Sequence, residues 1–128
     1  MKKTVVNNVP NGPKPGGPYS LGVIGEGKFL FVAGQGPYNP KTGNYERGTI
    51  EEQTALTMNN IKAIVEAAGA KMENAVSCRV YLHTLSLETF NKMNSVYKTY
   101  FGDQPPVRTT VGSQLLGIDV EIDCVVAM

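Results

Sequence analysis

Hydrophobic and polar residues change their spacing several times along this chain, and each change marks an expected element. Two apolar stretches, residues 21–24 and 28–33, flank Gly25-Glu26-Gly27, which predicts two strands joined as a short hairpin. Between residues 74 and 83 apolar and polar side chains alternate at a period of two, which predicts a third strand. Two further strands are expected at approximately 107–113 and 118–127.

Two segments instead carry apolar residues at helical spacing. Thr49 and Glu52 have the spacing of a capping box, and Gly69 is suited to end the first helix. Ser86 can cap a second helix, which should break before Pro105-Pro106. The expected apolar stripes are Ile50, Leu56, Ile61, Ile64, Val65 and Ala68 in the first helix, and Leu87, Phe90, Met93, Val96 and Tyr97 in the second.

The order of elements is strands, helix, strand, helix, strands, without an internal repeat. Residues 7–17 are rich in Pro, Gly and Asn and are expected to form an irregular arm. A length of 128 residues suits one domain with a real core. We therefore predict a single α+β domain across residues 1–128, with a mixed sheet and both helices on one of its faces.

The second face of this sheet is also apolar. Phe29, Phe31, Val125 and Ala127 alternate with Leu30, Val32, Cys124 and Val126, so each face of the two strands carries hydrophobic side chains. Two helices can cover only one face. We expect the other to be buried against a second subunit, the alternative being that the arm at residues 7–18 folds over it.

Composition and charge exclude several classes of function. Twelve basic and eleven acidic residues give a formal charge of +1, which offers no general attraction for nucleic acid or for an anionic membrane. No apolar run approaches the roughly 18 residues that a membrane span needs. Met1-Lys2-Lys3 is not followed by an apolar stretch, so we expect no secretory signal and a cytoplasmic protein with reduced, buried Cys78 and Cys124. One histidine and no Cys/His cluster argue against a zinc site.

Arg108 and Glu121 are the side chains on which chemistry could centre. Alternation puts Arg108 and Thr110 on one face of their strand, and a hairpin centred on Gln114 and Leu115 would set Arg108 opposite Glu121. A structural ion pair across the strands is the simpler interpretation and the one that spacing alone favours. In the functional interpretation, Arg108 binds a substrate carboxylate with its planar fork and Glu121 acts as a general base on water.

Other candidates are weaker on the residues alone. Tyr19 follows a Gly/Pro turn, where its ring could close a pocket or merely fix the arm to the surface. Asn94 lies off the apolar stripe of its helix and is by default exposed to solvent. His83 stands alone and is more typical of a packing or surface residue. Gly34, Gly36 and Gly43 do not form a phosphate-binding fingerprint, because no helix begins at them.

The chain resembles the reactive intermediate deaminase family, also called the Rid or YjgF family, whose members were historically described as L-PSP endoribonucleases or translation inhibitors. The resemblance covers nearly the whole chain. Its motifs are Gly17-Pro18-Tyr19-Ser20, the run from Gly34 to Gly43, the run from Asn60 to Gly69, Phe90 with Asn94 and Tyr97, the run from Pro106 to Val111, and Val120-Glu121-Ile122-Asp123.

The resemblance implies a chorismate-mutase-like subunit in a homotrimer with a central barrel and pockets at subunit interfaces. It implies hydrolysis of imines and enamines, such as 2-iminobutanoate and 2-iminopropanoate, to 2-oxo acids and ammonia without a metal or cofactor. Arg108 would hold the substrate carboxylate and Glu121 the attacking water. Tyr19 and Asn94 would line the pocket, while Gly34 and Thr110 would contribute backbone contacts.

The sequence also departs from the family pattern. Leu21-Gly22 replaces a common Gln-Ala, Leu116-Gly117 replaces a common Leu-Pro, and Thr110 is a cysteine in some relatives. Two other functions stay open at this point. One is an endoribonuclease or translation inhibitor, for which near-zero charge and a single histidine offer little support. The other is a non-catalytic binder of carboxylated metabolites that uses Arg108 alone.

Overall fold

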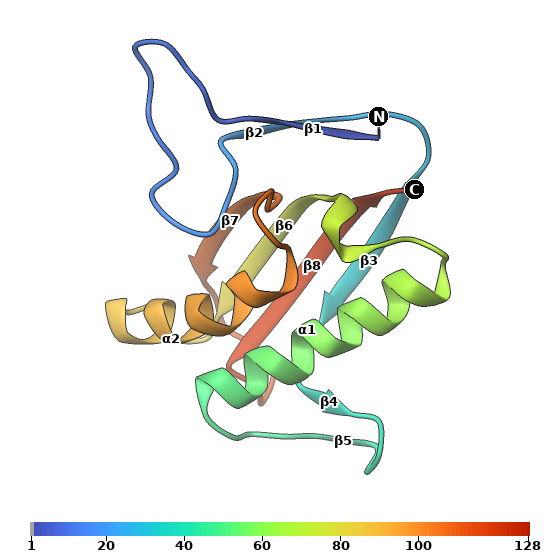
Figure 1. Cartoon of the computed structure of the whole chain (residues 1–128). Coiled ribbons are helices and arrows are strands. Elements are labelled where there is room, and N and C mark those ends of the chain that lie inside the picture. The colour runs from blue at the N-terminus through green and yellow to red at the C-terminus, as the bar shows by residue number, and fades with distance from the viewer. Residues whose placement is uncertain (1) are drawn as a thin grey trace.

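The computed structural model describes residues 2–128 and contains a mixed sheet, two helices and two small strand pairs (Figure 1). In chain order the elements are β1 (Lys3–Val6), β2 (Gly22–Gly25), β3 (Phe29–Gln35), β4 (Tyr38–Asn39), β5 (Asn44–Tyr45), α1 (Ile50–Ala67), the 3-10 turn η1 (Met72–Asn74), β6 (Ala75–Leu82), α2 (Leu87–Tyr97), the 3-10 turn η2 (Lys98–Tyr100), β7 (Val107–Gly112) and β8 (Val120–Ala127). The α+β prediction is confirmed.

The main sheet has the strand order β3-β8-β6-β7. β8 pairs antiparallel with both β3 and β6, whereas β7 pairs parallel with β6 at the sheet edge. A parallel pair needs a crossover, and α2 supplies it between β6 and β7. The predicted hairpin between the last two strands is therefore wrong, because β6 lies between β7 and β8.

The predicted hairpin of the first two apolar stretches is also wrong. β2 pairs with β1, a strand that was not expected, with Val23 opposite Val5. β3 pairs instead with β8, with Phe31 opposite Val125. Alternation decides which side of a strand is apolar, but it does not decide which neighbour supplies the hydrogen bonds.

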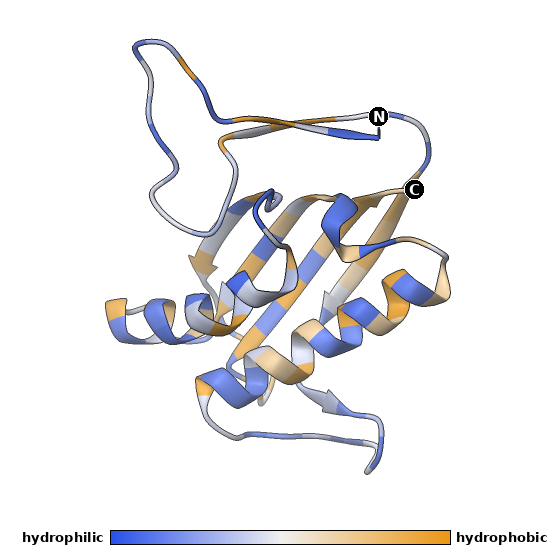
Figure 2. Ribbon diagram, viewed as in Figure 1, coloured by the Kyte–Doolittle hydropathy of each residue, from blue (hydrophilic) through white to orange (hydrophobic). Residues whose placement is uncertain are grey.

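Both helices pack on the same face of the sheet, as predicted (Figure 1). Hydrophobic and hydrophilic residues alternate along the central strands (Figure 2), and the apolar set on the helix side is buried. The centre of this core consists of the residues Met58, Ile61, Val65, Cys78, Val80, Leu82, Met93, Tyr97, Val120, Ile122, Cys124 and Val126. One contiguous core supports one folding unit.

α1 begins as expected but buries a partly different face. Thr49 and Glu52 form the predicted capping box, and Gly69 has a φ of 80° just beyond the helix end. Ile64 and Ala68, predicted to be apolar contacts, are exposed. Their places are taken by Met58 and by polar residues, so the buried list is Gln53, Thr54, Thr57, Met58, Ile61 and Val65.

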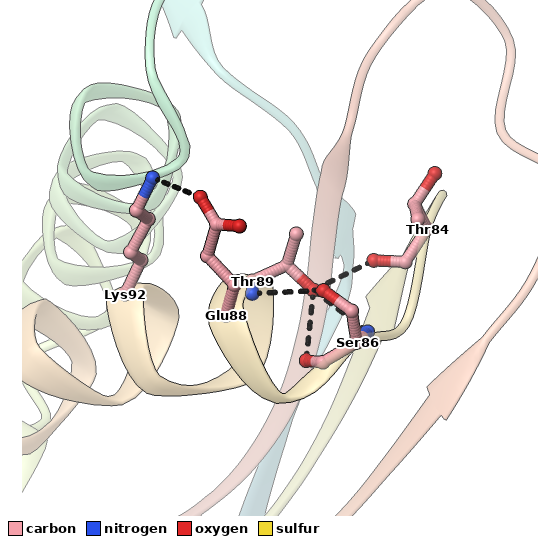
Figure 3. A network of polar contacts seen from close by, with 5 residues as sticks. All are labelled: Thr84, Ser86, Glu88, Thr89 and Lys92. Carbon is pink, nitrogen blue, oxygen red and sulfur yellow. Dashed lines mark hydrogen bonds and ion pairs between the residues drawn. The ribbon is translucent and has the colours of Figure 1, made fainter.

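α2 is fixed at its first turn by a reciprocal network (Figure 3). Thr89 N donates to Ser86 Oγ at 3.1 Å, and Ser86 N donates to Thr89 Oγ1 at 3.0 Å. Thr89 Oγ1 also donates to Thr84 O at 2.8 Å. The predicted cap at Ser86 is confirmed, while Leu87, expected in the apolar stripe, is 76% exposed.

The face of the sheet away from the helices stays open in the single chain. Phe31 is 75% exposed, so the arm at residues 7–18 does not cover this face as the alternative required. Val125 lies opposite Phe31 and is only half-buried. The arm is irregular, as predicted, connects β1 to β2, and lies at upper left in the view, above the β7 edge of the sheet (Figure 1).

Within residues 2–128, none of the helices combines the length and apolar character that crossing a membrane demands.

Candidate functional site

Arg108 lies on edge strand β7 and points toward the helix layer. It is in register with Cys78 of β6, whose side chain is in the core, and neighbouring residues of parallel strands share a face. Its Nη1 donates to Asn94 Oδ1 at 2.7 Å. Its guanidinium carbon lies 5.4 Å from the Phe90 ring centroid and 4.9 Å from that of Tyr97. Three side chains of α2 thus contact the guanidinium and fix its position.

The Arg108 guanidinium has no carboxylate partner among residues 2–128. Among the residues that the structure describes, ion pairs join Arg47 with Asp119, Lys62 with Glu66, Arg79 with Asp123 and Lys92 with Glu88. Burial lowers the pKa of Arg108, although Tyr97, Cys78 and Tyr19 oppose that effect. An arginine stays charged even so, and a poorly hydrated cation without an anion is a suitable partner for an anionic ligand.

Tyr19 lies beside Arg108 because the chain around it is tied to the start of β7. Ser20 N donates to Pro106 O at 3.1 Å, and Ser20 Oγ donates to Pro105 O. Tyr19 and Arg108 both line a cavity of about 350 Å³. The other lining residues are Ser20, Leu21, Ser77, Cys78, Arg79, Val107 and Thr109. The structure therefore brings Tyr19, Asn94 and Arg108 together.

Thr110 shares the face of Arg108 on β7 and lies in register with buried Val80. Its Oγ1 is buried, with no hydrogen-bond partner among the described residues. A buried hydroxyl without a partner is costly. Thr110 does not line the cavity that Tyr19 and Arg108 line.

Glu121 belongs to a different place on the molecule. It pairs with Tyr81 of β6, and its half-buried side chain is on the open face, opposite to buried Val120 and Ile122. Gly34 of β3 makes room for it, because a Cβ at Gly34 would lie 2.7 Å from Glu121 Oε2. Gly34 and Glu121 therefore form a pair of their own.

A cavity of about 530 Å³ adjoins this second group. Among the described residues that line it, Glu121 is the only acidic one, and most of its wall is the loop 113–118 that leads into β8. Gly34, Gly36, Tyr45 and Tyr81 complete the lining. The site thus consists of a carboxylate next to a cavity with both polar and apolar walls, which include two tyrosines.

The predicted contact between Arg108 and Glu121 is wrong within one chain. The two residues lie on opposite faces of the sheet, and β6 separates their strands. Arg108 matches Cys78, whereas Glu121 matches Tyr81, three residues further along β6. The structural ion pair is excluded for the same reason, so neither sequence-based interpretation of the pair holds inside a single subunit.

Asn94 was expected, from its spacing along the helix, to be exposed to solvent, and the structure instead places it against Arg108. It lies off the apolar stripe but contacts Arg108 because β7 is an edge strand that α2 overhangs. Phe90 and Tyr97, which were predicted as core residues, also flank the guanidinium.

His83 Nδ1 accepts a hydrogen bond from Leu115 N at 3.1 Å, which is a structural role for this residue. Within residues 2–128, no group of three or more His, Cys, Asp or Glu is placed to hold a metal ion.

Comparison with known proteins gives consistent matches over almost the entire chain. A family model described as Endoribonuclease L-PSP matches residues 9–128. A RutC family protein of Pyrococcus horikoshii is 47% identical over 123 residues, covering 96% of this chain and 94% of that protein. A 2-iminobutanoate/2-iminopropanoate deaminase of Dermatophagoides farinae is 33% identical over 130 residues, covering 100% of this chain and 99% of that protein.

Solved structures agree on the fold. A protein of the conserved Rid family from Yersinia pestis, whose function is unknown, superposes with a TM-score of 0.73 at 31% identity. The match covers 98% of this chain and 99% of that one.

Proposed function

The chain belongs to the Rid family, also described as the L-PSP endoribonuclease family, and from this premise we propose that it hydrolyses reactive 2-imino acids and their enamine tautomers to 2-oxo acids and ammonia. The observation that carries the proposal is the guanidinium of Arg108, which is half-buried beside a cavity, is oriented by Asn94 and has no carboxylate partner among residues 2–128. A guanidinium with free donors binds a carboxylate through two parallel hydrogen bonds.

A site that uses both Arg108 and Glu121 requires two subunits. Because the residues lie on opposite faces of one sheet, Arg108 of one subunit would meet Glu121 of its neighbour. The exposed apolar side chain of Phe31, on the face of Glu121, supports association through this face. We propose a cyclic homotrimer with one such shared site at each interface.

The reaction needs only water and proton transfers. Arg108 binds the substrate carboxylate, and an enamine first tautomerises to its imine. Glu121 accepts a proton from water as the water oxygen bonds to C2 of the imine, and the electrons of the C=N bond move to nitrogen. The proton then passes to that nitrogen, which gives a carbinolamine with one hydroxyl and one amino group. Glu121 next moves the hydroxyl proton to the nitrogen, the C–N bond breaks, and ammonia leaves as the C=O bond of the 2-oxo acid forms.

Arg108→Lys tests the role of the guanidinium. Lysine keeps the charge but loses the planar fork, so we expect KM for the imine to rise at least about tenfold. The imine is generated by an amino-acid oxidase in the presence of semicarbazide, which traps the imine as a semicarbazone. Hydrolysis of the imine is measured as the decrease in semicarbazone formation, because the trapping reaction also releases ammonia. A variant with unchanged KM and kcat would contradict the proposed binding mode.

Two other functions predict different results. A non-catalytic binder of carboxylates would not accelerate ammonia release, yet would bind 2-oxo acids through Arg108. A ribonuclease would cleave RNA, and its affinity for RNA should survive physiological salt. The formal charge of +1 and the absence of a second acidic residue in the Glu121 cavity give the ribonuclease no support.

A further inference from the structure

Gln53 is a fully buried polar residue in the first turn of α1, where this helix contacts the chain that leads into β8. Its exposed fraction is 0%, although glutamine is usually found on the surface. Both the NH2 group and the carbonyl oxygen of its side-chain amide form hydrogen bonds. Nε2 donates to Gly48 O at 3.1 Å and to Asp119 Oδ2 at 2.7 Å, and Oε1 accepts from Asp119 N at 2.9 Å.

Gln53 therefore forms hydrogen bonds with Asp119 at two points, the carboxylate and the backbone N–H of Asp119. A third contact comes from Arg47, whose Nη2 donates to Asp119 Oδ1 at 3.0 Å. A two-point contact fixes orientation as well as position, which a single hydrogen bond does not. Asp119 is thereby held against the first turn of a helix that is itself capped.

The same segment is fastened a second time by the end of β6. His83 N donates to Asp119 O at 3.0 Å, and His83 Nδ1 accepts from Leu115 N at 3.1 Å. Ser113 N donates to Leu82 O at 2.9 Å where the loop begins. The loop 113–119 is thus attached at its start, near its middle and at its end, although Leu116 between these points is 99% exposed.

Asp119 immediately precedes β8, and Glu121 is the second residue of that strand. The loop 113–118 forms most of the wall of the cavity that Glu121 also lines. We propose that Gln53 is a positioning residue, which fixes the start of β8 and so sets the place of the Glu121 carboxylate relative to that cavity. This inference rests on the proposed role of Glu121 as the base that acts on water.

The amide is the one group of this size that can make all three contacts. It must donate to a carboxylate and accept from an N–H at the same time, and an ionised glutamate cannot donate. Gln53→Glu would place two carboxylates together, and Gln53→Met would leave both Asp119 groups without their buried partner. Neither change touches the substrate or Arg108.

The first experiment compares kcat and KM of the full-length protein for an imine generated by an amino-acid oxidase. Gln53→Met should lower kcat about tenfold or more while KM changes less than about twofold, because Arg108 binds the substrate and Glu121 acts on water. Thr57→Val is the matched control. Thr57 is equally buried on α1, its Oγ1 has no described partner, and its replacement should leave kcat unchanged. An equal loss of kcat in Thr57→Val would overturn the inference.

A double-mutant cycle separates positioning from general stability. If Gln53 acts through Glu121, Gln53→Met should cost less than about twofold in kcat when Glu121 is already replaced by glutamine. If the losses in kcat from the two substitutions were additive, Gln53 would act independently of Glu121. Full activity of Glu121→Gln would refute the proposed role of Glu121 itself, whereas loss in Glu121→Gln with full activity in Gln53→Met would refute only the present inference.

A rescue experiment decides the matter if Glu121→Gln is too slow to measure. In Gln53→Glu/Asp119→Asn the new amide at position 119 can donate to the new carboxylate at position 53, so this hydrogen bond is reversed in direction. The carboxylate can also still accept from the backbone N–H of position 119, which restores two of the three contacts. The double variant should recover kcat at least about fivefold over Gln53→Glu alone. If kcat did not recover although both variants are folded at the assay temperature, the proposed positioning role of Gln53 would be contradicted.

Discussion

At the scale of single residues, the site is built from side chains whose freedom has been removed by neighbours. Arg108 is held by Asn94 and by two aromatic rings, and Tyr19 is held by the anchored Ser20. Glu121 occupies the space that Gly34 leaves, since a Cβ there would lie 2.7 Å from its Oε2. Preorganised groups of this kind lose little entropy when a ligand binds.

Gly34→Ala should therefore disturb the proposed reaction more than the fold. The atom in the way is the end of a flexible side chain, so the carboxylate can move aside at small cost in the free energy of unfolding. We expect kcat to fall about tenfold or more because the base is displaced. Gly22→Ala is the control, since a Cβ there meets Val6 Cβ at an ordinary 3.6 Å. Unchanged kcat in Gly34→Ala would mean that the carboxylate position is not critical.

At the scale of elements, α2 links the core to the site. Its Met93 and Tyr97 are buried, while Asn94 on the same helix reaches Arg108 at the edge strand. The first turn is fixed by Ser86, Thr89 and Thr84 (Figure 3). The position of Asn94 thus depends on a helix whose start is set by side-chain hydrogen bonds.

Ser86→Ala should lower the free energy of unfolding by about 1 kcal/mol, because the first turn loses its cap. Urea denaturation followed by circular dichroism measures this change. Ser95→Ala in the same helix is the matched control, since Ser95 Oγ only donates to Lys92 O on the exposed surface. Equal stability of Ser86→Ala and the unchanged protein would show that the cap is dispensable.

The sequence allowed the elements to be predicted much better than their pairing. Caps at Thr49 and Ser86 and the alternation of β6 depend on local spacing, and these predictions are confirmed. Pairing depends on contacts distant in the chain, and no local signal distinguishes a β7–β8 hairpin from a β7 that pairs parallel with β6. Gln53 was missed because a hydrophobic stripe is sought among apolar residues, and its partner Asp119 lies 66 residues away.

At the scale of the whole molecule, one chain presents two halves of the proposed site. The Arg108 half faces the helix layer at the sheet edge, and the Glu121 half faces the open side next to exposed Phe31. Neither half alone contains both an anchor for a carboxylate and a base. A site with both groups therefore requires an assembly of subunits.

Mixed assemblies test this requirement most directly. Arg108→Ala and Glu121→Gln are each expected to be almost inactive alone. If the site lies between subunits of a cyclic oligomer, random mixing at equal amounts gives about a quarter of the interfaces an intact Arg108 and an intact Glu121. Ammonia release from the imine should then rise to roughly that fraction of the unaltered protein's rate. Mixed subunits that stay as inactive as the separate variants, although mass spectrometry shows them to be co-assembled, would contradict the shared site.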